Sequence, residues 1–236
     1  MLCMIIRFLF ILCLIPSVNA EQYHFAAISD LYEQKVGEII LTHVYQKMGI
    51  DIQVTGMPGN RAAIETTKGR VDGEIMRIWS YGIDNPDVIR VPTPYYFLET
   101  MAFYKEGSDV VVNSAEDLAK YSVLKVRGVK HTNIITKGLD NVYDYDDTKS
   151  MLNALDEHRS NVALTHKGDG VFAISRYKIE HVIPAKKPLA VFSLYHYIHK
   201  KNAHLVERVN RILLDMKKSG ELNTLILKAE KQVFES

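Results

Sequence analysis

Residues 58–105 decide the fold of this chain. In order, the stretch contains Pro58-Gly-Asn-Arg61, Gly69-Arg-Val-Asp72-Gly73-Glu74-Ile-Met-Arg77, Arg90-Val-Pro92-Thr-Pro94-Tyr95-Tyr96 and Met101-Ala-Phe-Tyr-Lys105. It predicts a helix that ends at Gly69 and a strand over residues 71–76, with an arginine just past the end of that strand. In an α/β sheet, the carboxyl ends of strands open into the crevice where ligands bind. Arg77 would there offer a planar fork of donors to a carboxylate or phosphate.

Strand and helix patterns alternate on both sides of this stretch. Strands are predicted over 22–28 and 51–55, and an apolar stripe predicts a helix between them that ends at Gly49. A second unit repeats the alternation, and a β-rich run over 188–200 is long enough to cross back between the two units. The elements predicted for the second unit are strands over 122–127 and 161–165 and helices over 131–137, 147–158 and 171–177. Such alternation predicts parallel strands covered by helices.

The order of these motifs resembles the first lobe of the type II periplasmic solute-binding proteins, family 3, which includes the amino-acid receptors of ABC importers. It is most similar to a subgroup that carries Arg-Ala before a G-x-x-D-G-E-x-x-R run, here Arg61-Ala62 and residues 69–77. The resemblance implies an α/β chain with the two-lobed type II periplasmic binding protein fold. Each lobe would be a mixed sheet flanked by helices, and a two-strand hinge would join the lobes. We expect lobe 1 over 21–104 plus 195–236 and lobe 2 over 105–194.

Residues 1–20 have the pattern of a secretory signal peptide. Arg7 supplies the positive charge, residues 8–15 the apolar run, and Val18-Asn19-Ala20 the cleavage site. A membrane anchor is the alternative, but the apolar run is shorter than the roughly 20 residues that span a bilayer. We therefore expect cleavage after Ala20 and export to the periplasm. Both cysteines lie within this segment, so the mature chain must be stabilised by its core without disulfides.

The charge balance of the mature chain argues against a nucleic-acid partner. The 29 basic residues include Arg7, which leaves 28 basic against 28 acidic residues. A nucleic-acid-binding chain would carry an excess of basic residues over one face.

Arg77 is the strongest candidate for contact with a solute, because it could clamp an anionic group from lobe 1. The alternative is a surface ion pair with Asp84 or Asp87. Arg61 begins a helix whose positive end would add to its attraction for an anion, although it could equally be a solvated residue. Trp79 follows Arg77 and could line the cleft or pack in the core.

The resemblance implies further contacts in both lobes. Tyr32 precedes the first helix, where family members place an aromatic wall. Arg127 and Thr132 belong to the strand-to-helix turn where the family usually has a Gly-Thr pair, and backbone N–H groups there can hold a carboxylate. The family's amino-acid receptors hold the ligand ammonium with an aspartate at the position of His166. Asp169 is the candidate replacement, and the departure leaves open whether an amine is recognised.

These features favour a periplasmic receptor that closes around a small polar solute, anionic or amino-acid-like, for an ABC importer. The partners would be the solute and an ABC permease or a membrane sensor, and the receptor would be a monomer. The alternatives are a ligand-sensing partner of a membrane sensor and a dehydratase-like enzyme on the same fold. The chain has no G-x-S-x-G, H-E-x-x-H or P-loop motif, so we expect a protein without enzymatic activity, cofactor or metal.

Overall fold

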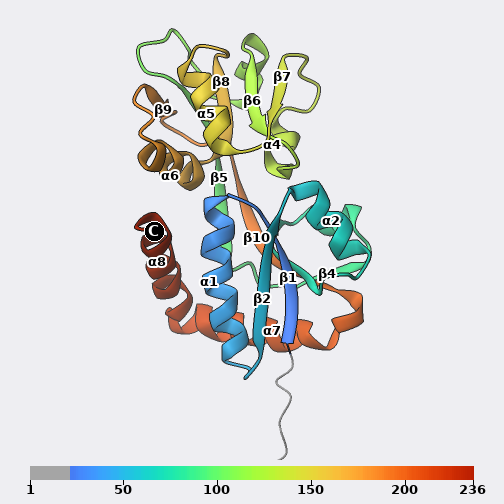
Figure 1. The fold of residues 1–236 in the computed structure, drawn as a ribbon. Helices are drawn as coiled ribbons and strands as arrows, with labels where there is room; N and C mark the ends of the chain where they lie inside the picture. Colours follow the sequence, from blue (N-terminus) through green and yellow to red (C-terminus); the bar gives the residue numbers. More distant parts are fainter. Residues whose placement is uncertain (1–21) are drawn as a thin grey trace, which may run out of the picture.

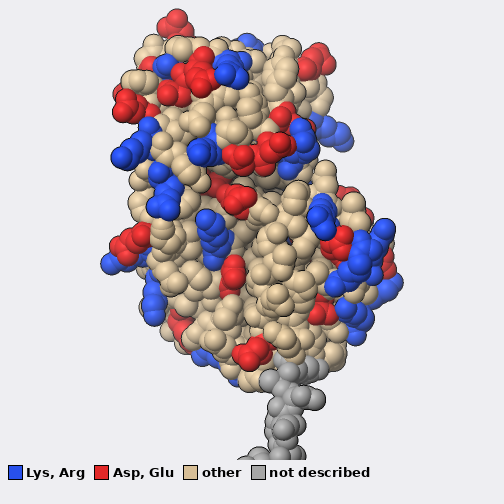
Figure 2. All heavy atoms as spheres, in the orientation of Figure 1, with Lys and Arg blue, Asp and Glu red and all other residues tan. Residues whose placement is uncertain are grey.

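The computed structural model describes residues 22–236, and the predicted signal peptide with its cleavage site lies outside the described residues. The described chain forms two lobes, one above the other in Figure 1, and the strands β5 and β10 run from one lobe to the other. Acidic and basic side chains are interspersed over both lobes on the face shown in Figure 2.

The first lobe, lower in Figure 1, is built mainly from the N-terminal part of the chain. Its elements are β1 Gln22–Ile28, α1 Tyr32–Gln46, β2 Asp51–Met57, α2 Gly59–Thr67, β3 Gly73–Ile78, α3 Tyr81–Asp84 and β4 Val88–Arg90. Strand β1 lies between β2 and β3, and it runs parallel to both. The parallel pairs follow from the helices that connect these strands, because each connection returns the chain to the same edge of the sheet.

The second lobe follows and the chain then returns to the first. The elements from β5 onward are β5 Tyr96–Lys105, η1 Ala115–Lys120, β6 Val123–Val126, α4 Lys130–Ile135, β7 Val142–Tyr145, α5 Thr148–Asp156, β8 Val162–His166, α6 Lys167–Tyr177, β9 Val182–Pro184, β10 Ala190–His199, η2 Lys200–Asn202, α7 His204–Ser219 and α8 Glu221–Phe234. Among the described residues the strands join in the order β2-β1-β3-β10-β5-β8-β6-β7, with β4 beside β10 and β9 beside β5. A mixed sheet therefore continues through both lobes.

Each lobe has its own hydrophobic core. The first core includes Phe25, Val36, Ile40 and Val44, and it is closed by residues of α7 and α8. The second includes Phe103, Leu124, Leu152 and Leu164. Along β5 and β10 the packing changes from one core to the other between Leu98 and Met101 and between Leu189 and Phe192. We therefore propose that the lobe boundaries lie inside these two strands, a few residues earlier in the chain than the sequence predicts.

Several elements differ from the sequence-based prediction, and α3, β4 and β9 were not predicted. Strand β3 begins at Gly73 and continues to Ile78, because Ile78 and Arg77 pair with Leu194 and Tyr195 of β10. Arg77 consequently lies inside the strand and not beyond its end. Helix α6 begins at Lys167, four residues before the predicted start at Val171, and the short strand β7 was not predicted.

The close pairing of β3 with β10 allows a test of the fold. A Cβ atom at Gly73 would lie 2.1 Å from the backbone oxygen of Tyr197. Because a backbone atom cannot rotate away, we expect Gly73→Ala to lower the free energy of unfolding by about 1–3 kcal/mol or more. Chemical denaturation would measure the loss. A variant as stable as the wild type would contradict the register of these two strands.

Candidate functional site

The two lobes meet where strands end and helices begin. From lobe 1, the ends of β1 and β3 and the starts of α1 and α2 face the β6–α4 turn of lobe 2, and Figure 1 shows α2 next to α4. The backbones approach closely, since a Cβ atom at Gly59 would lie 2.8 Å from the oxygen of Gly128. Lys130 of lobe 2 forms an ion pair with Asp84 of lobe 1. The junction is therefore the place where groups from both lobes can contact one bound molecule.

A pocket of about 360 Å³ lies at this junction and is lined from both lobes. Lobe 1 contributes Gly59, Asn60, Ala63, Arg77, Tyr81 and Asn85, and lobe 2 contributes Gly128, Lys130, Asn133, Ile134 and Lys137. Three of these side chains carry positive charge and none carries negative charge. A pocket with this lining favours a polar solute with an anionic group.

Arg77 lines the pocket, and part of its binding capacity is already used within lobe 1. Its side chain is 5% exposed, its Nε forms an ion pair with Glu74, and its Nη2 donates to the backbone oxygen of Gly59 at 2.9 Å. The guanidinium lies 4.9 Å from the ring centre of Tyr81, whose hydroxyl also donates to Glu74. Burial and the adjacent Glu74 raise the pKa of Tyr81, so its hydroxyl stays protonated. A guanidinium has five N–H donors, so donors remain for a solute.

The partner of Arg77 differs from both predicted alternatives. Asp84 pairs with Lys130, and Asp87 pairs with Lys200. Glu74 takes their place as the partner within β3. A regular strand would put residues three apart on opposite faces, but the register of β3 against β10 shifts between the pairs Arg77–Tyr195 and Glu74–Tyr197.

Three predicted contact residues lie away from the junction pocket. The side chain of Arg61 is 71% exposed and lies 4.0 Å from Glu65. That of Arg127 is 58% exposed and pairs with Asp146 at 2.8 Å. Trp79 is neither in the core nor in the pocket, because it is 51% exposed with Arg90 stacked 4.9 Å from its ring. The structure therefore does not bring these three side chains together with Arg77.

Tyr32 and Thr132 are buried in structural contacts. The ring of Tyr32 packs 5.6 Å from that of Phe172, and its hydroxyl donates to the backbone oxygen of Glu230 at 3.0 Å. The hydroxyl of Thr132 donates to the oxygen of Val129 within the first turn of α4. Neither side chain lines the junction pocket.

Asp169 joins the lobes instead of facing the pocket. It accepts hydrogen bonds from the Tyr32 N–H at 3.1 Å, from Thr148 at 2.5 Å and from Thr165 at 2.7 Å. Burial raises the pKa of this carboxyl, and the three hydrogen bonds oppose the increase. One of its oxygens thus holds the start of α1 in lobe 1, while the other holds two threonines of lobe 2.

His166 and His131 are both buried next to the junction. His166 accepts from the backbone N–H of Glu99 at 3.1 Å, and burial lowers its pKa to about 4. His131 is bonded to Thr100 at 2.8 Å, and burial followed by the neighbouring His166 lowers its pKa to about 3. Both imidazoles are therefore neutral at pH 7.

A second, much smaller cavity of about 20 Å³ lies deeper at the junction. Arg77 and Lys130 line both spaces, and the deeper one is also lined by Glu33, Gln34, Val129 and His131. Glu33 is only 3% exposed, and its Oε2 has no hydrogen-bond partner among the described residues. Sequence reasoning missed this residue. The available signal was an acidic side chain beside Gln34 in the first turn of an amphipathic helix.

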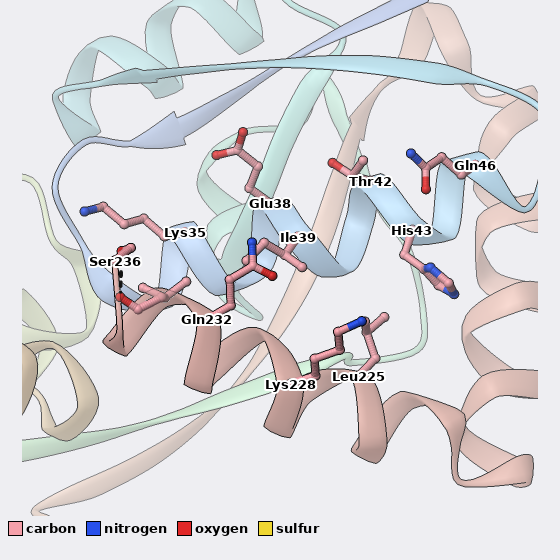
Figure 3. A pocket seen from close by; sticks show the side chains of 11 residues that line it. Lys35, Glu38, Ile39, Thr42, His43, Gln46, Leu225, Lys228, Gln232 and Ser236 are labelled. Carbon is pink, nitrogen blue, oxygen red and sulfur yellow. Dashed lines mark hydrogen bonds between the residues drawn. The ribbon is translucent and has the colours of Figure 1, made fainter.

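A larger hollow of about 500 Å³ lies between α1 and α8, on lobe 1 alone. Figure 3 shows that its side chains come from these two helices, with Lys35, Glu38 and His43 on one side and Lys228 and Gln232 on the other. Charges of both signs are mixed there on long side chains. The hollow lacks the convergent groups of a binding site, so the junction pocket is the better candidate.

Residues 22–236 contain no cluster of three or more histidine, cysteine or acidic side chains arranged to hold a metal ion. Within the same range, no helix combines the length and apolar character needed to cross a membrane.

Comparison with known proteins supports this architecture. No protein-family model matches the chain. An uncharacterised protein of Shewanella oneidensis is 23% identical over 224 residues, which cover 87% of this chain and 82% of the relative. Among solved structures, a histidine kinase sensor domain with similarity to periplasmic binding proteins superposes with a TM-score of 0.77 at 16% identity, covering 89% of this chain and 96% of that one.

Two binding proteins superpose almost as well. A mutant of the protein ArgBP from T. maritima gives a TM-score of 0.72 at 15% identity and covers 88% of this chain and 94% of its own. An amino acid ABC transporter substrate-binding protein from Streptococcus pneumoniae, bound to L-arginine, gives 0.72 at 15% identity and covers 91% and 97%. This chain therefore has the two-lobed α/β fold of periplasmic binding proteins.

Proposed function

We propose that this protein is a receptor that closes its two lobes around a small polar solute. The observation that carries the proposal is the junction pocket, which takes its lining from α2 and β3 of lobe 1 and from α4 of lobe 2. A molecule that contacts both walls stabilises the closed arrangement through contacts that an open one would lose. The two strands that join the lobes would act as the hinge.

The lining supports a solute with an anionic group. Arg77, Lys130 and Lys137 surround the pocket, and the charge of Lys137 is not engaged in any ion pair within the described residues. The solute would be amino-acid-like or a small carboxylate. In this proposal Arg77 keeps its predicted contact role, and Lys130 and Lys137 replace Arg61 and Arg127 as the other cations. Trp79, Tyr32, Thr132 and Asp169 act outside the pocket.

The solved structures support two uses of such a receptor. The arginine-bound ABC transporter protein supports delivery of the solute to an importer permease. In this proposal the chain is exported to the periplasm and acts as a monomer. The histidine kinase sensor domain supports the second use, in which a bound solute is reported to a membrane sensor.

The neighbouring binding proteins also favour a receptor over the dehydratase-like enzyme. A stable complex that returns the solute unchanged would support the receptor, whereas turnover of the solute would establish the enzyme.

Closure can be tested at the contact between Gly59 and Gly128. In the closed arrangement a side chain at position 59 would clash with a backbone oxygen of the other lobe, so we expect Gly59→Ala to favour the open form without weakening either core. Small-angle scattering should show a larger radius of gyration than for the wild type, with an unchanged free energy of unfolding. Gly56→Ala is the matched control, because its nearest contact would be 3.4 Å from Ser29 within lobe 1. Identical scattering from Gly59→Ala and Gly56→Ala would contradict the closing mechanism.

The buried pair of Arg77 and Glu74 predicts a stability effect in addition to any effect on binding. Arg77→Ala would leave Glu74 buried beside Tyr81 without its cationic partner, and such a change typically costs about 3–5 kcal/mol. We expect a loss of that size in urea denaturation. The double variant Arg77→Met, Glu74→Gln should recover much of it, because no unpaired charge remains. If Arg77→Ala alone is as stable as the wild type, the pair contributes little to lobe 1.

A further inference from the structure

The carboxyl of Glu33 differs from the other buried acidic groups at the junction. Glu74 is paired with Arg77, and Asp169 accepts three hydrogen bonds. Glu33 is equally buried, but its Oε2 has no partner among residues 22–236 and the side chain lines the small cavity between the lobes. Buried polar atoms are almost always hydrogen-bonded, so an unpartnered carboxyl oxygen in a binding protein points to a group supplied from outside.

No charged group around this cavity satisfies Glu33. Arg77 of β3 is engaged by Glu74, and Lys130 of α4 is engaged by Asp84. His131 of α4 is neutral at pH 7, because burial lowers its pKa. The nearby Asp169 of α6 repels a second negative charge. The two cations that line the cavity are therefore paired with Glu74 and Asp84, and neither is hydrogen-bonded to Oε2 of Glu33.

We infer that Glu33 binds a protonated amine of the solute, with the carboxyl of Glu33 as its counter-charge at the lobe junction. The inference rests on the proposed solute-binding function and adds an amine to the chemistry of the solute. A cavity of about 20 Å³ accommodates one group the size of a water molecule, and an ammonium group is of that size. Because Arg77 and Lys130 line both spaces, the remainder of the solute would extend past them into the larger pocket.

Binding of an amine would displace a proton from Glu33. Burial, followed by repulsion from Asp169, raises the pKa of Glu33 from 4.5 to about 8, while a hydrogen bond from its own backbone opposes the increase. The carboxyl is therefore largely protonated at pH 7 when no cation faces it. An ammonium group stabilises the ionised form, so the proton is released to the solvent as the amine binds.

Glu33→Gln tests the inference, with Glu38→Gln as the matched control on an exposed part of the same helix. The probes are pairs of compounds that differ only in the amine, such as L-alanine with L-lactate and glycine with glycolate, together with L-glutamine, L-lysine, γ-aminobutyrate and putrescine. Thermal shift identifies the compounds that bind, and calorimetry gives their dissociation constants. We expect binding of amines, about tenfold or more weaker in Glu33→Gln and unchanged in Glu38→Gln.

Two further measurements on the wild type test the inference without comparing the affinities of variants. Calorimetry of a bound amine at pH 7, in buffers with different ionisation enthalpies, should show release of a proton. Without solute, the folded state holds the Glu33 proton between about pH 4.5 and 8 and the unfolded state does not, so the free energy of unfolding should fall as pH rises through that range. Glu33→Gln should reduce this slope, while the contribution of Asp169 persists.

The outcomes separate this inference from the proposed function. If the 2-hydroxy acids bind as tightly as the amines and Glu33→Gln changes nothing, the receptor stands and the role of Glu33 is overturned. Absence of proton release on binding of an amine would also overturn it. If none of the compounds binds and Gly59→Ala scatters like the wild type, the proposed function fails, and the inference fails with it.

Discussion

The antiparallel pairing of β5 with β10 is the constraint on which the rest of the structure depends. The register from Ala190 opposite Thr100 to Leu194 opposite Tyr96 fixes two extended strands side by side where they leave one core and enter the other. Along each of these two strands, the side chains on one side of the junction pack into the core of lobe 2, and those on the other side pack into the core of lobe 1. Two cores connected through these strands are compatible with the proposed bending at the junction, and Ile28 and Leu31 of lobe 1 and Phe172 of lobe 2 pack across it.

The same constraint determines which groups can meet in the cleft. Besides β5 and β10, the junction is formed largely by ends of strands and first turns of helices, so binding groups come from short segments far apart in the sequence. The Arg77 region of β3 and the first turns of α1 and α4 are such segments, and Asp169 ties the start of α1 to lobe 2. Backbone glycines at 59 and 128 allow the lobes to approach closely enough for these segments to share one pocket.

Hydrophobic periodicity predicted most of the fold, because each core selects one face of each helix and strand. The stripe through Val36, Ile40 and Val44 lies on the helix that the sequence predicts between the first two strands. The exact ends of the strands were harder to predict, because they depend on pairing with strands that are distant in the sequence. Strand β3 is extended by pairing with β10, some 120 residues later in the chain. Strand β7 is an edge strand without a buried face, so its residues show no apolar alternation.

The first turn of α6 was not predicted, because it contains two glycines. Gly168 and Gly170 lower the helix propensity of its first turn, although Asp169 between them is held by hydrogen bonds that only the folded chain provides.

The candidate site was less predictable than the fold, because exposure and pairing decide whether a charged residue can act. Arg61 and Arg127 have the right residue type next to the right turns, but both point to solvent and pair with nearby acids. Arg77 lines the junction pocket, but its ion-pair partner Glu74 was not among the predicted alternatives Asp84 and Asp87. Glu33 was missed for the opposite reason. Its position at the start of an amphipathic helix is typical of a solvated acidic residue that interacts favourably with the helix end, whereas in the folded chain it is only 3% exposed.

The three buried carboxyls of the junction illustrate how a cleft can discriminate between solutes. Glu74 and Asp169 are satisfied by the protein itself, so their contribution is the same for every solute. Glu33 is satisfied only conditionally, because its ionised form requires a cation that the protein does not provide. A solute without an amine leaves that oxygen unpaired in the closed cleft, and an unpaired buried polar group costs free energy. Selectivity of this kind arises from the penalty imposed on the wrong solute as much as from attraction for the right one. It also requires closure, since in an open cleft water would satisfy Glu33 and the difference between solutes would largely disappear.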